Sequence, residues 1–447
     1  MSKLKRFRGG FPLLLALGSV GAAFGPLAQA QSLVELYESA RAFDASYLSA
    51  RLQYDANLAR AAQSRAGILP SASLAAGASR SNFESNSPVS ERSFNTQTAT
   101  LSASQPLYRP ANWAGFEQGK KQLELARAQL DAAEQDLIVR SSQTYFDVLA
   151  SQDSLTFVQA QKAAVQEQLA FAKRNFEVGT STITDTREAQ ARSDLVVAQE
   201  IAAENDLRIK KIALDQLVGQ SETRPRGLQL PLALPPIVPN DVSAWVQQAE
   251  EHHPGIRQAR SNLELADLEV SKAEAGHKPT LDVTASYNVT RNPSGTVQIA
   301  SASRTNNASL GLVFNLPLFA GFATQNRILE TQALEDKARS DLEGTRRAVA
   351  QNTRTAFFGM VSGQGQVKAL EAAELSSQSA LEANRLGYQV GVRINIDVLN
   401  SQSQLFQTKR DLARARYDVL VGGLRLRQAN GTLKAQDLLP IDALLAR

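Results

Sequence analysis

Two kinds of hydrophobic pattern alternate along this chain. In long stretches without proline, apolar residues recur every seven positions. The spacing is clearest at Leu123, Leu130, Leu137, Leu405, Leu412, Val419 and Leu426. A sustained seven-residue repeat predicts left-handed packing of helix on helix, and the many alanines between these positions allow close approach.

The helical pattern predicts six helices of very unequal length. Their expected ranges are 33–67, 111–176, 186–218, 242–275, 324–388 and 398–430. The second and fifth hold about 65 residues each, so at about 1.5 Å per residue each would be close to 100 Å long. That is about three times the thickness of a bilayer core, so such helices belong to an elongated molecule that projects into solvent.

Four shorter segments alternate apolar and polar residues, two before each long helix. They are 72–78, 99–107, 280–290 and 308–318, and the third is the clearest, with Leu281, Val283, Ala285, Tyr287 and Val289 facing Thr, Asp, Ser and Asn. This period of two predicts strands with one apolar face. The segments between them, 81–94 and 292–305, are rich in Ser and Asn and are expected to be exposed loops.

The two clearer segments have the length of ten to twelve residues that is typical of a strand in an outer-membrane β-barrel. One apolar and one hydroxyl-rich face suit lipid outside the barrel and water inside it. Four strands cannot close a barrel, and an open sheet edge is not tolerated in lipid. The chain should therefore assemble, a dimer supplying eight strands and a trimer twelve. The alternative is a pair of hairpins packed on a soluble domain.

The whole arrangement occurs twice. Gly391 and Asp397 follow Gly179 and Asp185 by 212 positions, and Gly431 follows Gly219 by the same offset. A nearly constant offset indicates duplication of one ancestral unit. We expect a first repeat over 31–218, a linker over 219–240, a second repeat over 241–431 and a tail over 432–447.

The first thirty residues have the form of a secretory signal peptide, with four basic residues, an apolar run from Phe11 to Val20 and Ala28-Gln29-Ala30 before the expected cut. Its removal would leave equal numbers of acidic and basic residues. A neutral chain with interspersed charges has no field to hold a nucleic acid, so that partner is excluded. The chain has no cysteine, so packing or assembly must stabilise it.

No catalytic, cofactor-binding or metal site is expected. The three histidines are His252 and His253 beside Pro254, and His277 before Pro279, and none has the spacing of a metal pair. We expect them at the surface or in turns. Glu250 and Glu251 are interpreted as charges at a helix end. Neither a phosphate-binding glycine loop nor a nucleophile elbow occurs, so the chain is not expected to be an enzyme.

At residues 31–433 the chain resembles the outer-membrane efflux protein family. The matching motifs are Ala249 to Pro254, the flanking Pro279 and Pro317, Val178-Gly179-Thr180 with Val390-Gly391-Val392, and Gly431-Thr432-Leu433. The resemblance implies a homotrimer with a twelve-stranded barrel in the outer membrane and a coiled-coil helical tunnel in the periplasm. It also implies a periplasmic adaptor and an inner-membrane pump of the ABC, RND or MFS type as partners.

The two Val-Gly turns are candidate contacts for the adaptor. By resemblance the contact residues are Val178, Gly179, Thr180, Val390, Gly391 and Val392. The simpler interpretation is that each glycine closes a helix with left-handed dihedrals, and this is compatible with a contact role.

Two aspartates follow these turns and open the next helices. Asp185 with Glu188 has the form of a capping box, and Asp397 has the equivalent place, so both are expected to cap helices. If Asp397 also faces a threefold axis, three carboxylates converge on a pore constriction and select cations. The family pattern has a second acidic position there, which in this chain is Asn400, so we expect a single acidic ring with weaker cation preference.

The resemblance further implies an entrance latch. Tyr388 would bond Asp185, and Arg393 would bond Thr184 of a neighbouring protomer. Any one such bond is worth only about 1 kcal/mol, so closure would be a sum of weak links that an adaptor can outcompete. For Arg393 a solvated charge near a helix end is an equally good interpretation.

Two functions remain. The first is a passive outer-membrane exit duct for efflux or type I secretion, opened by an iris-like movement of its entrance helices. The second is a secreted coiled-coil scaffold without a pore. We also expect 217–240 and the tail from Thr432 to form a belt around the middle of the tunnel. The sequence does not identify the cargo.

Overall fold

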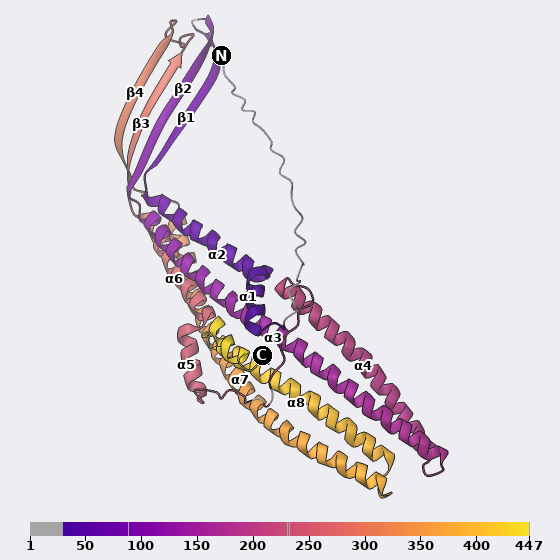
Figure 1. Cartoon of the computed structure of the whole chain (residues 1–447). Coiled ribbons are helices and arrows are strands. Elements are labelled where there is room, and N and C mark those ends of the chain that lie inside the picture. Colours follow the sequence, from indigo (N-terminus) through magenta and orange to yellow (C-terminus); the bar gives the residue numbers. More distant parts are fainter. Residues whose placement is uncertain (1–29, 88, 230, 232, 447) are drawn as a thin grey trace, which may run out of the picture.

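The computed structural model describes residues 30–87, 89–229, 231 and 233–446. Apart from Ala30, the predicted signal peptide lies outside the described residues. The chain is elongated, with a sheet at one end and two long helical hairpins at the other (Figure 1). Within the described ranges, no helix combines the length and apolar character needed to cross a membrane.

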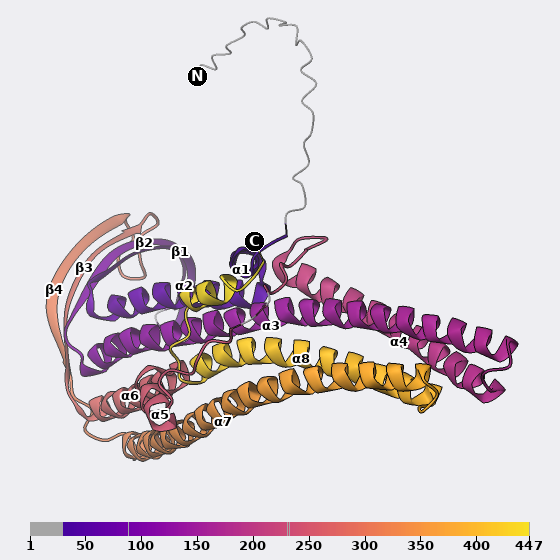
Figure 2. The ribbon, with the colours of Figure 1, turned by 60° about the horizontal axis from the view of Figure 1, so that its bottom comes forward.

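The longest helices are α3, Pro110–Glu177, and α7, Ala323–Gln389, with 68 and 67 residues. Each turns back into a shorter partner, α4 over Ile183–Val218 and α8 over Asn395–Ala429. The two hairpins lie side by side along their length (Figure 2). The predicted long helices and their coiled packing are confirmed.

The two predicted single helices that precede the strands are each broken in two. The first copy has α1, Leu33–Phe43, and α2, Ala45–Ser64, and the second has α5, Val242–His252, and α6, Pro254–Glu274. Asp44 and His253 occupy the breaks and cap the helices that follow. A side chain that accepts from the backbone at these positions outcompetes helix continuation, and Pro254 cannot donate to the preceding turn.

Short 3-10 turns connect the helical part to its neighbours. They are η1, Arg65–Ile68, η2, Ala275–His277, and η3, Ala435–Leu438, the last leading into α9, Leu439–Asp442. The repeated glycines share one conformation in both copies: φ is 77° at Gly179 and 82° at Gly391, and 68° at Gly219 and 77° at Gly431. The duplicated sequence thus produces duplicated turns.

Four antiparallel strands form one sheet in the order β1-β2-β3-β4. Their bounds are Ser71–Asn86, Val89–Tyr108, Thr280–Asn292 and Ser303–Asn315. The expectation that 81–94 is a loop was wrong, because Ser81 pairs with Phe94 and the ladder continues to Asn86 and Val89. The polar residues there are paired strand residues, and only the 293–302 connection is a loop of the predicted kind.

The predicted alternation of the two faces is confirmed. On one face Leu74, Leu101 and Tyr287 form a row across three strands and are 74%, 52% and 45% exposed. On the other face hydroxyl groups pair across strands, as in Ser73 with Ser102 and Ser286 with Ser309, both at 2.8 Å. A large exposed apolar face on a sheet requires a nonpolar surrounding.

A paired arginine and aspartate connect the sheet to the helices. The guanidinium of Arg109, just before α3, donates two hydrogen bonds of 2.7 and 2.5 Å to the carboxylate of Asp282 in β3. Asp282 is only 5% exposed. A carboxylate so deeply buried needs this partner, which therefore fixes the angle between strand and helix.

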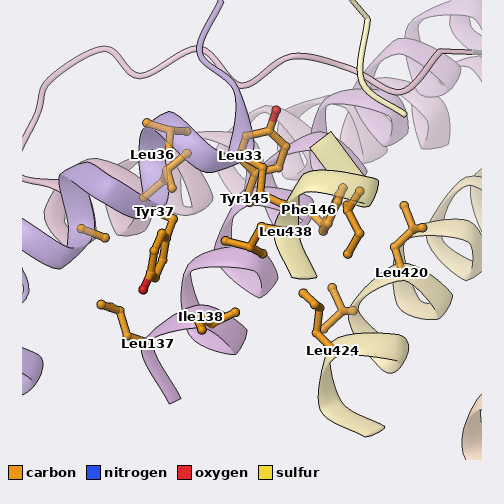
Figure 3. Close-up of a cluster of buried hydrophobic side chains, with 14 of the residues drawn as sticks. Leu33, Leu36, Tyr37, Leu137, Ile138, Tyr145, Phe146, Leu420, Leu424 and Leu438 are labelled. Carbon is orange, nitrogen blue, oxygen red and sulfur yellow. The ribbon is translucent and has the colours of Figure 1, made fainter. Parts of the chain in front are cut away.

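The main hydrophobic core lies near the middle of the molecule, where α1, α3 and α8 meet the C-terminal segment (Figure 3). Tyr145 and Phe146 meet edge to face at 5.4 Å, and Phe146 stacks on Tyr417 at 5.6 Å. The linker and the tail touch each other beside this core, through a bridge between Leu228 and Leu445. The belt around the tunnel stays a prediction.

Candidate functional site

The two hairpin tips have the same construction. Val178 and Val390 end α3 and α7, and the glycines that follow take left-handed dihedrals. The Gly179 amide donates to the Phe176 carbonyl at 3.0 Å, and the Gly391 amide donates to the Tyr388 carbonyl at 3.2 Å. The simpler interpretation of the two glycines, closure of a helix, is therefore correct.

Apolar side chains are exposed at both tips. Val178, Val390 and Val392 are 72%, 66% and 75% exposed. A methyl group added to Gly179 or Gly391 would meet no atom within 4 Å, so the surface around each glycine is open. The exposed valines give each turn a small apolar contact surface.

Asp185 lies one turn inside α4. The helix is capped by Thr182, and Asp185 is the acidic third residue of a capping box, its carboxylate accepting from the Thr182 amide at 3.1 Å. The prediction that Asp185 is itself the cap, with Glu188 as its partner, was wrong, because Thr182 begins the helix three residues earlier. Partial burial raises the pKa of Asp185, but hydrogen bonds from Ser181 and Thr182 outweigh it and bring the pKa below its usual value.

Asp397 also lies in the first turn of its helix and not at the cap, which is Ile394. The expectation of a capping role was wrong here too, since no side-chain cap bond forms at this helix start. Instead Asp397 pairs with Arg393, one turn earlier, at 3.7 Å between Nη1 and Oδ2. Because the two side chains are 58% and 33% exposed, the pair contributes well under about 1 kcal/mol.

Asn400 lies on the exposed side of α8, one turn beyond Asp397. Its side-chain oxygen accepts a hydrogen bond of 2.9 Å from Nη2 of Arg192 in α4. The bond joins the first copy to the second near the predicted constriction. Sequence reasoning missed Arg192, although its position two turns beyond Asp185 was a usable signal.

Asn395, the first residue of α8, is fully buried between the hairpins. Its oxygen accepts from Gln168 in α3, and its amide donates to the backbone carbonyl of Asp185 in α4 at 3.3 Å. A buried polar group with both partners satisfied fixes its neighbours in one arrangement. This second missed residue therefore ties three helices together near the tips.

The predicted latch residues lie close to the tips, but within the single chain they do not form the predicted bonds with one another. The ring of Tyr388 meets Phe171 edge to face at 6.0 Å, and the described residues show no hydrogen bond between Tyr388 and Asp185. Thr184 is exposed, as is Arg393. Both are therefore accessible to a neighbouring chain, and the latch stays a prediction.

The histidines occupy turns and helix ends. Nδ1 of His253 accepts from the Gly255 amide at 3.0 Å, which makes His253 the cap of α6. His252 is exposed beside Glu251, and His277 lies in η2. Over the residues that the structure describes, there is no cluster of three or more side chains able to hold a metal ion.

The family model described as outer membrane efflux protein matches residues 36–220 and 245–432. The chain is 33% identical over 427 residues to the outer membrane protein TolC of Vibrio cholerae serotype O1, covering 95% of this chain and 97% of that protein. It is 30% identical over 430 residues to the proteases secretion protein PrtF of Dickeya chrysanthemi, covering 94% and 92%.

A solved structure has the same fold. The outer membrane protein VceC of Vibrio cholerae superimposes with a TM-score of 0.78 at 20% identity, over 89% of this chain and 96% of that one. Its matching arrangement of long helices and strands supports the expected fold class, a duplicated helical barrel that continues into a β-barrel.

Proposed function

This chain belongs to the outer membrane efflux protein family, and we propose that it forms the exit duct of a tripartite efflux or type I secretion system. As a family member it is an outer-membrane channel and not an enzyme, with its helices in the periplasm. One observation carries the proposal: a single duplicated chain joins an exposed apolar sheet face to helices of 68 and 67 residues.

The proposed duct is a homotrimer. In the sheet that the structure describes, β1 and β4 are edge strands, and the apolar face includes Leu310 and Leu312 at 79% and 69% exposure. Edges in lipid must be paired, and three copies supply a closed barrel of twelve strands. Apolar residues also remain exposed on α4, including Ile201 at 63% and Ile212 at 59%, where a neighbouring chain would cover them.

Opening is proposed as an iris-like movement of the entrance helices. The contacts that hold the tips are few and weak: the Arg393–Asp397 pair, the Arg192–Asn400 bond and the buried Asn395. The exposed ion pair contributes well under about 1 kcal/mol, and the other contacts contribute about 1 to 3 kcal/mol each. A periplasmic adaptor that covers the exposed valines of both tips gains a comparable free energy by apolar burial, since each fully buried valine contributes about 1.5 kcal/mol or more.

The constriction is proposed to be weakly selective for ions. Asp397 supplies one acidic ring, but Arg393 pairs with it and Arg192 lies at the level of Asn400. Two guanidinium groups therefore oppose one carboxylate in each chain. Cations should be favoured less than a bare acidic ring would favour them.

The cargo is proposed to be chosen by the inner-membrane pump, with the duct acting as a passive conduit. The names of relatives include both possibilities, a proteases secretion protein and an outer membrane efflux protein. Deletion of the gene would separate these possibilities: loss of an exported protein indicates secretion, whereas sensitivity to dyes and antibiotics indicates efflux.

Membrane fractionation and planar bilayers test the function itself. A duct stays with detergent-extracted outer membrane and gives stable conductance steps in a bilayer. A scaffold washes free with salt and gives no conductance. The scaffold alternative is disfavoured by the apolar sheet face, which has no use in a soluble molecule.

A further inference from the structure

Two arginines lie directly opposite each other at the outer end of the sheet. In the ladder between β3 and β4, Arg291 is the partner of Arg304, and across β2 its partner is Gln97. Residues paired in this way project from the same face, with Cβ atoms about 5 Å apart. Like charges at that distance repel each other, so an anion bound between them would stabilise the pair.

The arginine pair lies on the apolar face of the sheet. In β3 the side chains of Tyr287, Val289 and Arg291 share one face, and in β4 those of Leu310, Ala308 and Arg304 share it too. Arg80 belongs to the same face, one row further out, opposite Asn95. Three basic residues thus lie just beyond the end of the lipid-facing surface.

The pair borders a shallow hollow of about 730 Å³ in the surface of the sheet. Its lining includes Arg291, Arg304, Gln97 and Ser303 on the polar side, and Ala99 and Val289 on the apolar side. Nε of Arg304 donates to Asn306 at 3.3 Å, which orients its guanidinium. Among the described residues neither arginine has an ion-pair partner, and the single acidic residue of 280–315, Asp282, lies at the far end of β3.

The position of the hollow matches the level of lipid headgroups. From Asp282 to Arg291 the strand rises about 30 Å, which at a tilt of about 40° spans about 23 Å of membrane. The apolar band of an outer-membrane barrel is about 25 Å tall. The proposed function puts the helices in the periplasm, so the end of the sheet that carries Arg291 lies in the outer leaflet. This placement of the arginines rests on the proposed function.

We propose that Arg291 and Arg304 bind the phosphate groups of an outer-leaflet lipid, one with a phosphorylated sugar headgroup such as lipid A. The guanidinium pair holds phosphate through forked hydrogen bonds, while an acyl chain lies along Val289 and the apolar rows beneath. The same face on each of three chains gives three sites around the trimer.

The test measures lipid A binding to the detergent-purified trimer by native mass spectrometry. The wild-type protein should bind lipid A with both phosphates at least about tenfold more tightly than dephosphorylated lipid A. The Arg291→Gln/Arg304→Gln variant should lose that preference. Arg92→Gln is the matched control, because Arg92 lies at the same end of the sheet on the opposite face, opposite Phe83, and it should bind as the wild type does.

In a second experiment, inorganic phosphate at millimolar concentration is added to the trimer with lipid A bound. If the lipid stays bound, the result supports lipid docking. If phosphate displaces all of the lipid, the site binds free anions and the proposal is overturned. Equal binding of both lipids by the wild type also overturns it, and this comparison requires no variant. Channel conductance is recorded on the same samples. Trimers that conduct but bind both forms of lipid A equally would contradict the lipid site alone. The absence of conducting trimers would contradict the proposed function.

Discussion

Arg192 in α4 donates a hydrogen bond of 2.9 Å to the side-chain oxygen of Asn400 in α8. The bond joins the two copies of the duplicated unit where the tunnel is expected to be narrowest. It also brings a positive charge to a position that would otherwise be neutral. The charge of the constriction therefore depends on Arg192 and Arg393 as well as on Asp397.

Asn400→Asp should make the channel more selective for cations. The new carboxylate would pair with Arg192 and, in a trimer, add three negative charges near the constriction. We expect the ratio of cation to anion permeability, obtained from reversal potentials in a salt gradient, to rise about severalfold. Asn400→Ser is the matched neutral control, and a variant indistinguishable from it would show that Asn400 does not face the pore.

Arg393→Ser combined with Tyr388→Phe should raise single-channel conductance in planar bilayers. The first change removes the ion pair to Asp397 and any bond to a neighbouring chain, and the second removes only a hydroxyl from a ring that stays packed on Phe171. Arg414→Ser, at a side chain 80% exposed along α8, serves as control. Unchanged conductance in the double variant would remove the latch from the account.

Asn395→Ala should loosen the contact between the hairpin tips without unfolding the chain. The change leaves the side-chain amide of Gln168 without its acceptor and removes the side-chain donor to the Asp185 carbonyl. The expected loss of stability is about 1 to 3 kcal/mol. Amide hydrogen exchange should accelerate around both tips. Asn384→Ala, which breaks a bond to Ser401 within the second hairpin alone, should accelerate exchange there only; equal patterns for the two variants would contradict the role given to Asn395.

Stability should fall on acidification because of His253. Burial and the nearby Arg257 lower the pKa of His253 below its usual value of about 6.5, and the unprotonated ring accepts the Gly255 amide. The unfolded chain therefore binds the proton more readily, so the contribution of His253 is complete above about pH 6.5 and is lost as pH falls through the folded pKa.

Thermal unfolding from pH 7.5 to 5 would measure this effect. His253→Asn keeps a capping side chain that does not titrate, so its melting temperature should depend less on pH in this range. His252→Asn changes the exposed neighbour and should leave the wild-type dependence intact. If His253→Asn retains the full dependence, other groups cause it.

Much of the fold follows from periodicity. The seven-residue repeat predicted α3 and α7 almost to their ends, since long helices packed on each other obey a simple rule. The strands were foreseen where one face is apolar, at Leu281 and its neighbours. They were missed at 81–94, because a paired extension beyond the membrane needs no apolar face and looks like a polar loop.

The site was only partly predictable for a different reason. The tip glycines were identified because a left-handed residue has a strong sequence preference. The roles of Arg192 and Asn395 depend on which side chains meet across copies more than 200 residues apart, and no local pattern records that. The helix breaks at Asp44 and His253 were likewise hidden, because each is one capping side chain within an otherwise helical pattern.

The central claim is that identical chains combine their strands into one barrel in the outer membrane. Light scattering coupled to size-exclusion chromatography, with the detergent contribution subtracted, measures the protein mass of the purified assembly. The account predicts a mass of about three chains and loss of solubility when detergent is removed. A single-chain mass that persists in buffer without detergent would contradict it.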